Sequence, residues 1–239
     1  MATKAKAPAK TPKTKQAPVA DALPLIPEAW PGAFGIYKYS KTAVMPNILP
    51  LVALFFGSYI VSFFIGIIFE IIPRVGYSLG QLASQIVAIF FSIAIYKVLL
   101  HSIRGKTADP IETLKASPEY FVKMVLAYLL CGAILVASFI ALIVPFFFIA
   151  PRLVNVGYFI LDKNMGVMDA LKASWNTTDK NVGKVYGIVG AYIAYSLLFI
   201  TIIGIPFAIY FIVMYSASTT VYYEYTSKQN PNPLEPKAA

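Results

Sequence analysis

Two long hydrophobic stretches, each interrupted near its middle by proline, limit what this chain can fold into. One covers residues 119–162 around Pro145, and the other covers residues 184–225 around Pro206. A continuous helix of such a length would measure roughly 60 Å at about 1.5 Å per residue, which is about twice the hydrocarbon thickness of a bilayer. Each stretch is therefore predicted to cross a membrane twice, as a helical hairpin.

The remaining apolar runs extend this prediction to six spans, because two more runs flank the pair Pro73 and Arg74. The predicted spans are 48–72, 77–100, 119–143, 145–162, 184–203 and 206–225. Only 13% of the residues are charged, against roughly 25% in soluble domains. We expect an all-α integral membrane fold in which six transmembrane helices form three proline-turned hairpins. A cytoplasmic interfacial helix is expected to precede each hairpin.

The two ends of the chain are predicted to lie outside the membrane domain. The first 20 residues contain five lysines and no acid, and they consist otherwise mainly of alanine, proline and threonine. Such a composition cannot bury enough apolar surface to fold. We predict a disordered basic tail at 1–30, a six-span membrane domain at 31–226 and a disordered C-terminal tail at 227–239. No apolar core of a cleavable signal peptide is found in the tail, so the first span is expected to act as an uncleaved signal anchor.

The distribution of lysine and arginine favours one orientation in the membrane. The N-terminal tail, the loops at 101–118 and 163–183, and the C-terminus all contain lysines, and all fall on one side of a six-span arrangement. Basic loops are retained in the cytoplasm. We therefore expect a multi-pass protein of the bacterial cytoplasmic (plasma) membrane with both termini in the cytoplasm. The lipid bilayer is the expected partner, with anionic lipids bound by the lysine-rich tail, and no nucleic acid is expected.

The loops between the hairpins contain signals for short helices of their own. The run DPIE at 109–112 matches an N-cap, a proline at the first helical position and an acid in the first turn. Ser117 and Pro118 repeat the cap-and-proline signal before the third span. Apolar residues on one face of residues 167–175 predict an amphipathic helix. These signals favour interfacial helices over plain loops.

An internal repeat links these short helices to the hairpins. The motif LKAS occurs at 114–117 and again at 171–174, before the second and the third hairpin. Aligning the two hairpin prolines brings Asp162 to within one residue of Glu224. The first hairpin matches more loosely, with YSK at 39–41 before it and a proline near its turn. We interpret the chain as three copies of one unit, with chance similarity between membrane segments as the alternative.

The chain also resembles several bacterial families of multi-pass membrane proteins. The residues that match are LIVP at 142–145, Arg152 in the following span, and DALKASW at 169–175. One of these families is the membrane domain attached to some glycerophosphodiester phosphodiesterases. The resemblance covers residues 30–226 and implies a multi-pass helical fold. The phosphodiesterase of that family is a separate soluble domain rich in acids and histidines, so the resemblance does not imply its activity here.

Arg152 is the most unusual residue of the predicted spans. A charged side chain at mid-bilayer costs roughly 2.5 kcal/mol or more, so it must face protein, water or headgroups. Asn155 lies three residues further and shares its helix face. The pair is a candidate anion or lipid-phosphate contact. The alternative is a structural arginine that donates to carbonyls freed by Pro145 and Pro151.

Two further polar sets lie in the first hairpin. Glu70 and Arg74 flank the predicted turn and are a candidate ion pair at the interface, as a proton or cation site or as a local pair that holds the turn. Gln81, Ser84 and Gln85 recur at helical spacing in the second span. Hydrogen bonds between helices explain such a patch, and a pore lining is the alternative.

The sequence argues against catalysis. Cys131 is the single cysteine and His101 the single histidine, which excludes an intramolecular disulfide and a multi-histidine metal site. No nucleotide-binding, zinc-protease or serine-hydrolase motif is present. We expect a non-enzymatic integral membrane protein without cofactor or metal, acting in envelope or membrane organisation. A transporter or channel for a small solute or lipid is the alternative, favoured by the repeats and the proline-broken helices.

Overall fold

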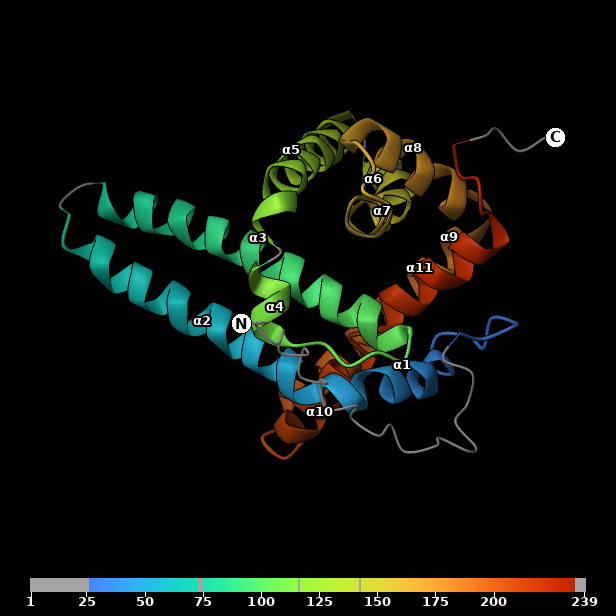
Figure 1. Ribbon diagram of the computed structural model, residues 1–239, viewed down its shortest axis with the longest axis horizontal. Helices are drawn as coiled ribbons and strands as arrows, with labels where there is room; N and C mark the ends of the chain where they lie inside the picture. The colour runs from blue at the N-terminus through green and yellow to red at the C-terminus, as the bar shows by residue number, and fades with distance from the viewer. Residues whose placement is uncertain (1–25, 73–74, 116, 142, 235–239) are drawn as a thin grey trace, which may run out of the picture.

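The computed structural model describes residues 26–72, 75–115, 117–141 and 143–234, and no strand occurs among them. Figure 1 shows the arrangement of the helices. In chain order the elements are α1 Ile36–Val44, η1 Met45–Asn47, α2 Ile48–Glu70, α3 Gly76–Ile103, α4 Pro110–Lys115, α5 Pro118–Ala141, α6 Ile143–Ile149, η2 Ala150–Leu153, α7 Val156–Lys163, α8 Val167–Thr178, η3 Asp179–Asn181, α9 Val182–Ser196, η4 Leu197–Ile200, α10 Gly204–Tyr215 and α11 Ser218–Gln229.

Six helical segments are long and apolar enough to cross a membrane, which makes the chain a multi-pass membrane protein. They are Ile36–Glu70, Gly76–Ile103, Pro118–Ala141, Val144–Lys163, Val167–Ile200 and Gly204–Gln229. The prediction of an all-α protein with six spans is confirmed. The short helices α1 and α8 run directly into the spans that follow them, through the one-turn elements η1 and η3. The first and fifth segments are therefore longer than predicted.

The hairpin prolines lie just inside the returning helices, near the starts of the predicted spans at 145 and 206, and a proline within each turn itself is not confirmed. Pro145 is the third residue of α6, and Pro206 is the third residue of α10. Proline is tolerated in the first turn of a helix because the N–H groups there have no intrahelical partner. Each of the two prolines thus belongs to the start of the returning helix. Pro73 lies outside the described residues.

The packed part of the molecule extends beyond the predicted domain limits. The ring of Trp30 lies 5.8 Å from that of Tyr222, and Ile26 also packs against the core. At the other end, α11 continues to Gln229, and the Asn176 side chain donates to the Pro233 carbonyl at 2.8 Å. Packed residues are therefore found a few positions beyond the predicted boundaries at 30 and 227, and the disorder of the two tails stays a prediction. The predictions for residues 1–25 and 235–239 fall outside the described part of the chain.

The predicted start of α4 is confirmed together with its cap, whereas the predicted start of α5 is confirmed without its cap. Helix α4 begins at Pro110, and the Asp109 carboxylate accepts a hydrogen bond from the Ile111 N–H at 2.8 Å. Helix α5 begins at Pro118 as predicted. Ser117 does not cap it, because its buried hydroxyl donates backwards to the Thr113 carbonyl.

The short helix before each hairpin packs against the final helix of another hairpin. Helix α4 contacts α3, α8 contacts α7 and η2, and α1 contacts α10 and α11. The second hairpin is thus attached to the first, the third to the second, and the first to the third. The three units form a closed cycle, with the beginning of the chain packed against its end.

Two serines make the same contact at two of these attachments. The Ser40 hydroxyl of α1 donates to the Met214 carbonyl at 2.6 Å and accepts from the Ala217 N–H at 3.1 Å. The Ser174 hydroxyl of α8 donates to the Arg152 carbonyl and accepts from the Asn155 N–H at 2.6 and 3.2 Å. In both cases the serine bridges a carbonyl and the N–H three residues later, where a spanning helix is interrupted. Each serine therefore replaces backbone hydrogen bonds that the interruption removes.

The same two units agree further along the chain. Asn47 and Asn181 each lie seven residues after the bridging serine, each ends a three-residue 3₁₀ turn, and each is buried. The Asn47 side chain donates to Ser102 and to the Lys106 carbonyl and accepts from the Ala108 N–H. This local match between the first and third units is closer than the match between the second and third units that the sequence motif indicated.

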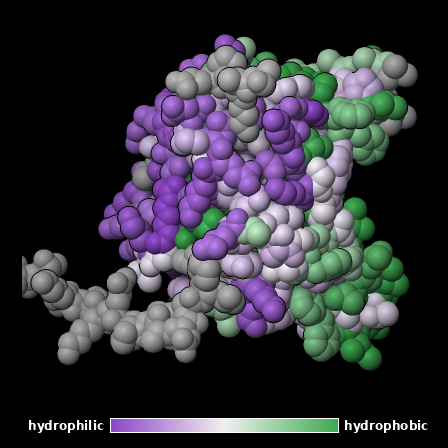
Figure 2. All heavy atoms as spheres, turned by 90° about the vertical axis from the view of Figure 1, so that its right-hand side faces the viewer, coloured by the Kyte–Doolittle hydropathy of each residue, from purple (hydrophilic) through white to green (hydrophobic). Residues whose placement is uncertain are grey.

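Hydrophilic and hydrophobic residues gather on opposite sides of the molecule. In Figure 2 hydrophilic residues cover one side and hydrophobic residues form two lobes on the other. Within the protein the buried residues form two clusters, one around α1, α10 and α11 and the other around α5, α7 and α8.

Candidate functional site: a cavity between the spanning helices and a charged junction

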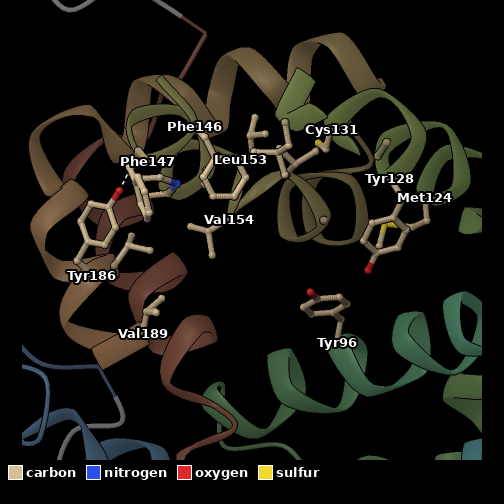
Figure 3. A pocket seen from close by; sticks show the side chains of 17 residues that line it. Tyr96, Met124, Tyr128, Cys131, Phe146, Phe147, Leu153, Val154, Tyr186 and Val189 are labelled. Carbon is tan, nitrogen blue, oxygen red and sulfur yellow. Dashed lines mark hydrogen bonds between the residues drawn. The ribbon is translucent and has the colours of Figure 1, made fainter. Parts of the chain in front are cut away.

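A cavity of about 490 Å³ lies between α3, α5, α6, η2 and α9. Figure 3 shows Tyr96, Cys131, Phe146, Val154 and Val189 around it, contributed by five different parts of the chain. Its volume lies within the range of roughly 300–1,000 Å³ typical of small-molecule sites. Nearly all of the lining is apolar, apart from three tyrosine hydroxyls. The cavity is therefore suited to an apolar ligand.

The interruption of the fourth span creates this cavity. Pro151 has no N–H, so the Phe147 carbonyl lacks its usual helical donor and the helix gives way to η2. The Tyr186 hydroxyl of α9 donates to this Phe147 carbonyl (Figure 3). Phe147 and Tyr186 both line the cavity. The proline thus separates α6 from α7, and the tyrosine satisfies the carbonyl that the proline leaves free.

A row of aromatic side chains connects the cavity with the hydrophilic side of the molecule. The Tyr96 ring, in the cavity lining, packs edge-on against Tyr158 at 4.8 Å, and Tyr158 stacks on Tyr223 at 5.1 Å. The Tyr223 hydroxyl then donates to the Asp162 carboxylate at 2.8 Å. Tyr158 and Tyr223 are fully buried. The row is a packed and continuous connection between the cavity and a group of charged residues.

The charged group at the end of this row is a junction of three side chains, here called the charged junction: Arg104, Asp162 and Glu224. The Arg104 guanidinium lies 2.7 Å from the Asp162 carboxylate and 2.8 Å from that of Glu224. Burial acts to lower the pKa of Arg104, but the hydrogen bonds and charges of the two carboxylates outweigh burial and raise that pKa. The junction joins the last helices of all three hairpins.

The charged junction was not predicted from the sequence, although the sequence contains one signal for it. The repeat alignment placed Asp162 next to Glu224, at matching ends of the second and third hairpins. The matching end of the first hairpin is the end of α3, directly before Arg104. Helix ends at equivalent positions of a cyclic arrangement lie at the same level of the cycle, and here the three are close enough for their side chains to meet. The three charges could have been found by extending the repeat to its third copy.

Arg152 is held by protein groups on several sides. Its guanidinium donates to the Phe148 carbonyl at 2.6 Å and to the Asp179 carboxylate at 2.9 Å. It also lies over the Trp175 ring at 4.9 Å. The arginine thus donates to a carbonyl at the helix interruption, but not to one that a proline frees, because the carbonyl freed by Pro151 is that of Phe147, which accepts from Tyr186. The structural interpretation in its predicted form stays a prediction. An anion contact stays a prediction. Within this guanidinium, the buried Nε has no hydrogen-bond partner among the described residues.

Asn155 is fully buried but does not act together with Arg152. Its side-chain amide lies 3.4 Å from the Thr226 hydroxyl, and its backbone N–H donates to Ser174. Its side-chain oxygen has no hydrogen-bond partner among the described residues. The two residues predicted as one candidate contact therefore point into different surroundings.

The polar residues of the first hairpin are spread along its exposed part. Glu70 is exposed at the end of α2, and Arg74 lies outside the described residues, so the predicted ion pair is not visible. Gln81, Ser84 and Glu70 line a groove between α2 and α3. Gln81 and Gln85 are exposed, and none of the described groups forms a hydrogen bond with the side chains of Gln81, Ser84 or Gln85. The hydrogen bonds to other helices that were predicted for Gln81, Ser84 and Gln85 are thus not formed within the described part of a single chain.

Taken together, the fold and the cavity define a multi-pass membrane protein with an apolar internal site. Comparisons with protein-family profiles, with curated proteins and with solved structures gave no significant match for this chain. The resemblance to the membrane domain of glycerophosphodiester phosphodiesterases stays a prediction.

Proposed function

We propose that this chain is a non-enzymatic membrane protein that holds a lipid acyl chain in the cavity between α3, α5, α6 and α9. The observation behind this proposal is the cavity itself, which is apolar and lies between spanning helices. Retention of lipid fits a role in membrane or envelope organisation. It also fits the alternative function, a transporter, in the case where the transported molecule is a lipid.

The position of the cavity opening favours an acyl chain over a polar solute. Four lining residues, Tyr128, Phe147, Tyr186 and Val189, are 41–54% exposed. The cavity therefore opens at the outer surface of the spanning helices, where hydrocarbon surrounds the protein. An acyl chain can enter from the bilayer without passing through water. A polar solute would find few hydrogen-bond partners in this lining and would lose its hydration.

Filling the cavity should displace the bound chain. Cys131 lines the cavity from α5, and Ala133 lies on the exposed face of the same helix. We expect Cys131→Trp to abolish a lipid that co-purifies with the wild type in mild detergent, as measured by native mass spectrometry. Ala133→Trp adds the same side chain outside the cavity and should retain the lipid. Equal lipid content in both variants would rule out the cavity as the binding site.

We further propose that the hydrophilic side faces the cytoplasm of a bacterial cell, with both termini on that side, because the lysine-rich segments of the sequence all fall on one side of a six-span arrangement and basic segments are retained in the cytoplasm. The exposed residue Val75 directly precedes α3, and the exposed residue Thr107 follows its other end by four residues. In a Cys131→Ser background, Thr107→Cys should resist a membrane-impermeant thiol reagent added to intact cells, whereas Val75→Cys should react. The reverse labelling pattern would invert the proposed topology.

A further inference from the structure

The outer half of the first hairpin is not covered by the rest of the described chain. Helices α2 and α3 project side by side away from the other helices (Figure 1). Apart from Gly76 and Gly80, which are covered by α2, the buried residues of α3 begin only at Ile93. Between Gly80 and Ile93, the faces of α3 that do not contact α2 are therefore exposed to the surroundings of the protein.

One of these faces is polar, and its spacing is that of a helix-packing seam. Ser78, Gln81, Gln85, Ala88 and Ser92 recur at alternating intervals of three and four residues, which places them in one stripe. The first four are exposed. Every member of the stripe is small or polar, although α3 is otherwise strongly apolar. Small and polar residues are the ones that mediate packing of helices in membranes.

The inner end of the stripe already forms a helix contact. The Ser92 hydroxyl lies 3.5 Å from the Tyr128 hydroxyl of α5, and it also donates to the Ile89 carbonyl. From Ser92 outward no helix of the described chain covers the stripe. Gln81 and Gln85 lie in the spanning segment Gly76–Ile103, and their side-chain amides have no hydrogen-bond partner among the described residues. Such groups are costly in hydrocarbon unless a partner satisfies them.

We propose that a second copy of this chain packs against the stripe, with Gln81 and Gln85 of the two copies hydrogen-bonded to each other. A glutamine amide offers both donors and an acceptor. Two identical stripes can therefore satisfy each other across a twofold axis, which is the commonest symmetry of protein assemblies. Lipid hydrocarbon offers no such partner. The proposal does not require an occupied acyl-chain cavity, although Tyr128, which Ser92 contacts, also belongs to the cavity lining.

The test is self-association of full-length protein in lipid vesicles, measured by energy transfer between copies labelled with donor and acceptor dyes. The double variant Gln81→Leu/Gln85→Leu should associate roughly tenfold more weakly or worse, since each lost amide pair weakens association severalfold. Both positions are exposed, so leucine should not impair folding of the single chain. The variant Gln81→Asn/Gln85→Asn keeps the amide groups and should retain most of the association.

A matched control changes the neighbouring face of the same helix. Leu79 and Leu82 are exposed on α3 but lie outside the stripe, so Leu79→Ala/Leu82→Ala should associate like the wild type. In addition, Gln85→Cys in a Cys131→Ser background should form an oxidised dimer more readily than Leu82→Cys. A monomeric wild-type protein, or association unaffected by the leucine variant, would overturn the proposal, as would isolation of a different protein on this face.

Discussion

Replacing Arg104 with methionine should destabilise the protein by about 2–3 kcal/mol, because the charged junction would lose its only cation. Asp162 and Glu224 have side chains only 15% and 13% exposed, and both lie within 3 Å of the same guanidinium nitrogen. Without Arg104 they would repel each other with little water to screen them. The estimate lies below that of a fully buried pair because 39% of the Arg104 side chain is exposed. Thermal unfolding in detergent should show a fall of roughly 5–10 °C.

Two further variants separate the loss of charge from the loss of packing. Arg104→Lys retains the positive charge but cannot present a planar fork to two carboxylates, so its effect should be intermediate. The triple variant Arg104→Met, Asp162→Asn, Glu224→Gln removes all three charges and should recover part of the stability. If the single and triple methionine variants unfold at the same temperature, carboxylate repulsion is not the cause of the instability.

The second large effect is expected at the bridging serines. Ser40 and Ser174 are fully buried, and each satisfies one carbonyl and one N–H where a helix is interrupted. Replacement by alanine leaves both backbone groups without a partner in a site closed to water. A loss of about 1–3 kcal/mol is expected for each of Ser40→Ala and Ser174→Ala, measured by equilibrium unfolding in mixed micelles.

Ser117 provides the control for this prediction. It is also fully buried and also lies in a short segment before a hairpin, but its hydroxyl donates only to the Thr113 carbonyl one turn back. Removing such a local bond has little effect on stability. Ser117→Ala should therefore be nearly neutral. An equal loss for all three serines would show that burial of the hydroxyl, rather than the bridge, determines the effect.

The spans were predictable because the bilayer imposes a single requirement, an apolar run of about 20 residues. The turns were less predictable. Pro145 and Pro206 lie in the first turn of a helix instead of in the turn before it. A proline marks a helix boundary to within a few residues but does not say on which side of the boundary it lies.

The candidate sites were harder to predict because they depend on which helices become neighbours. Arg152 was singled out as a charge in an apolar span, and that reasoning needs only local sequence. Arg104 lies at a helix end, where basic residues are common, and nothing in its neighbourhood in the sequence indicates its two carboxylate partners. The cavity depends on residues of five elements that are ordinary apolar residues when considered singly.

The closed cycle of attachments has a consequence for how the protein is made. Helix α1 is synthesised among the first segments, yet Ser40 contacts Met214 and Ala217, 174 and 177 positions later. The ribosome must therefore deliver all three hairpins to the membrane before the first helix can reach its final place. Contacts between residues so far apart in the chain form slowly. Until the last hairpin is inserted, the face of α1 that will contact it stays exposed to other proteins of the membrane.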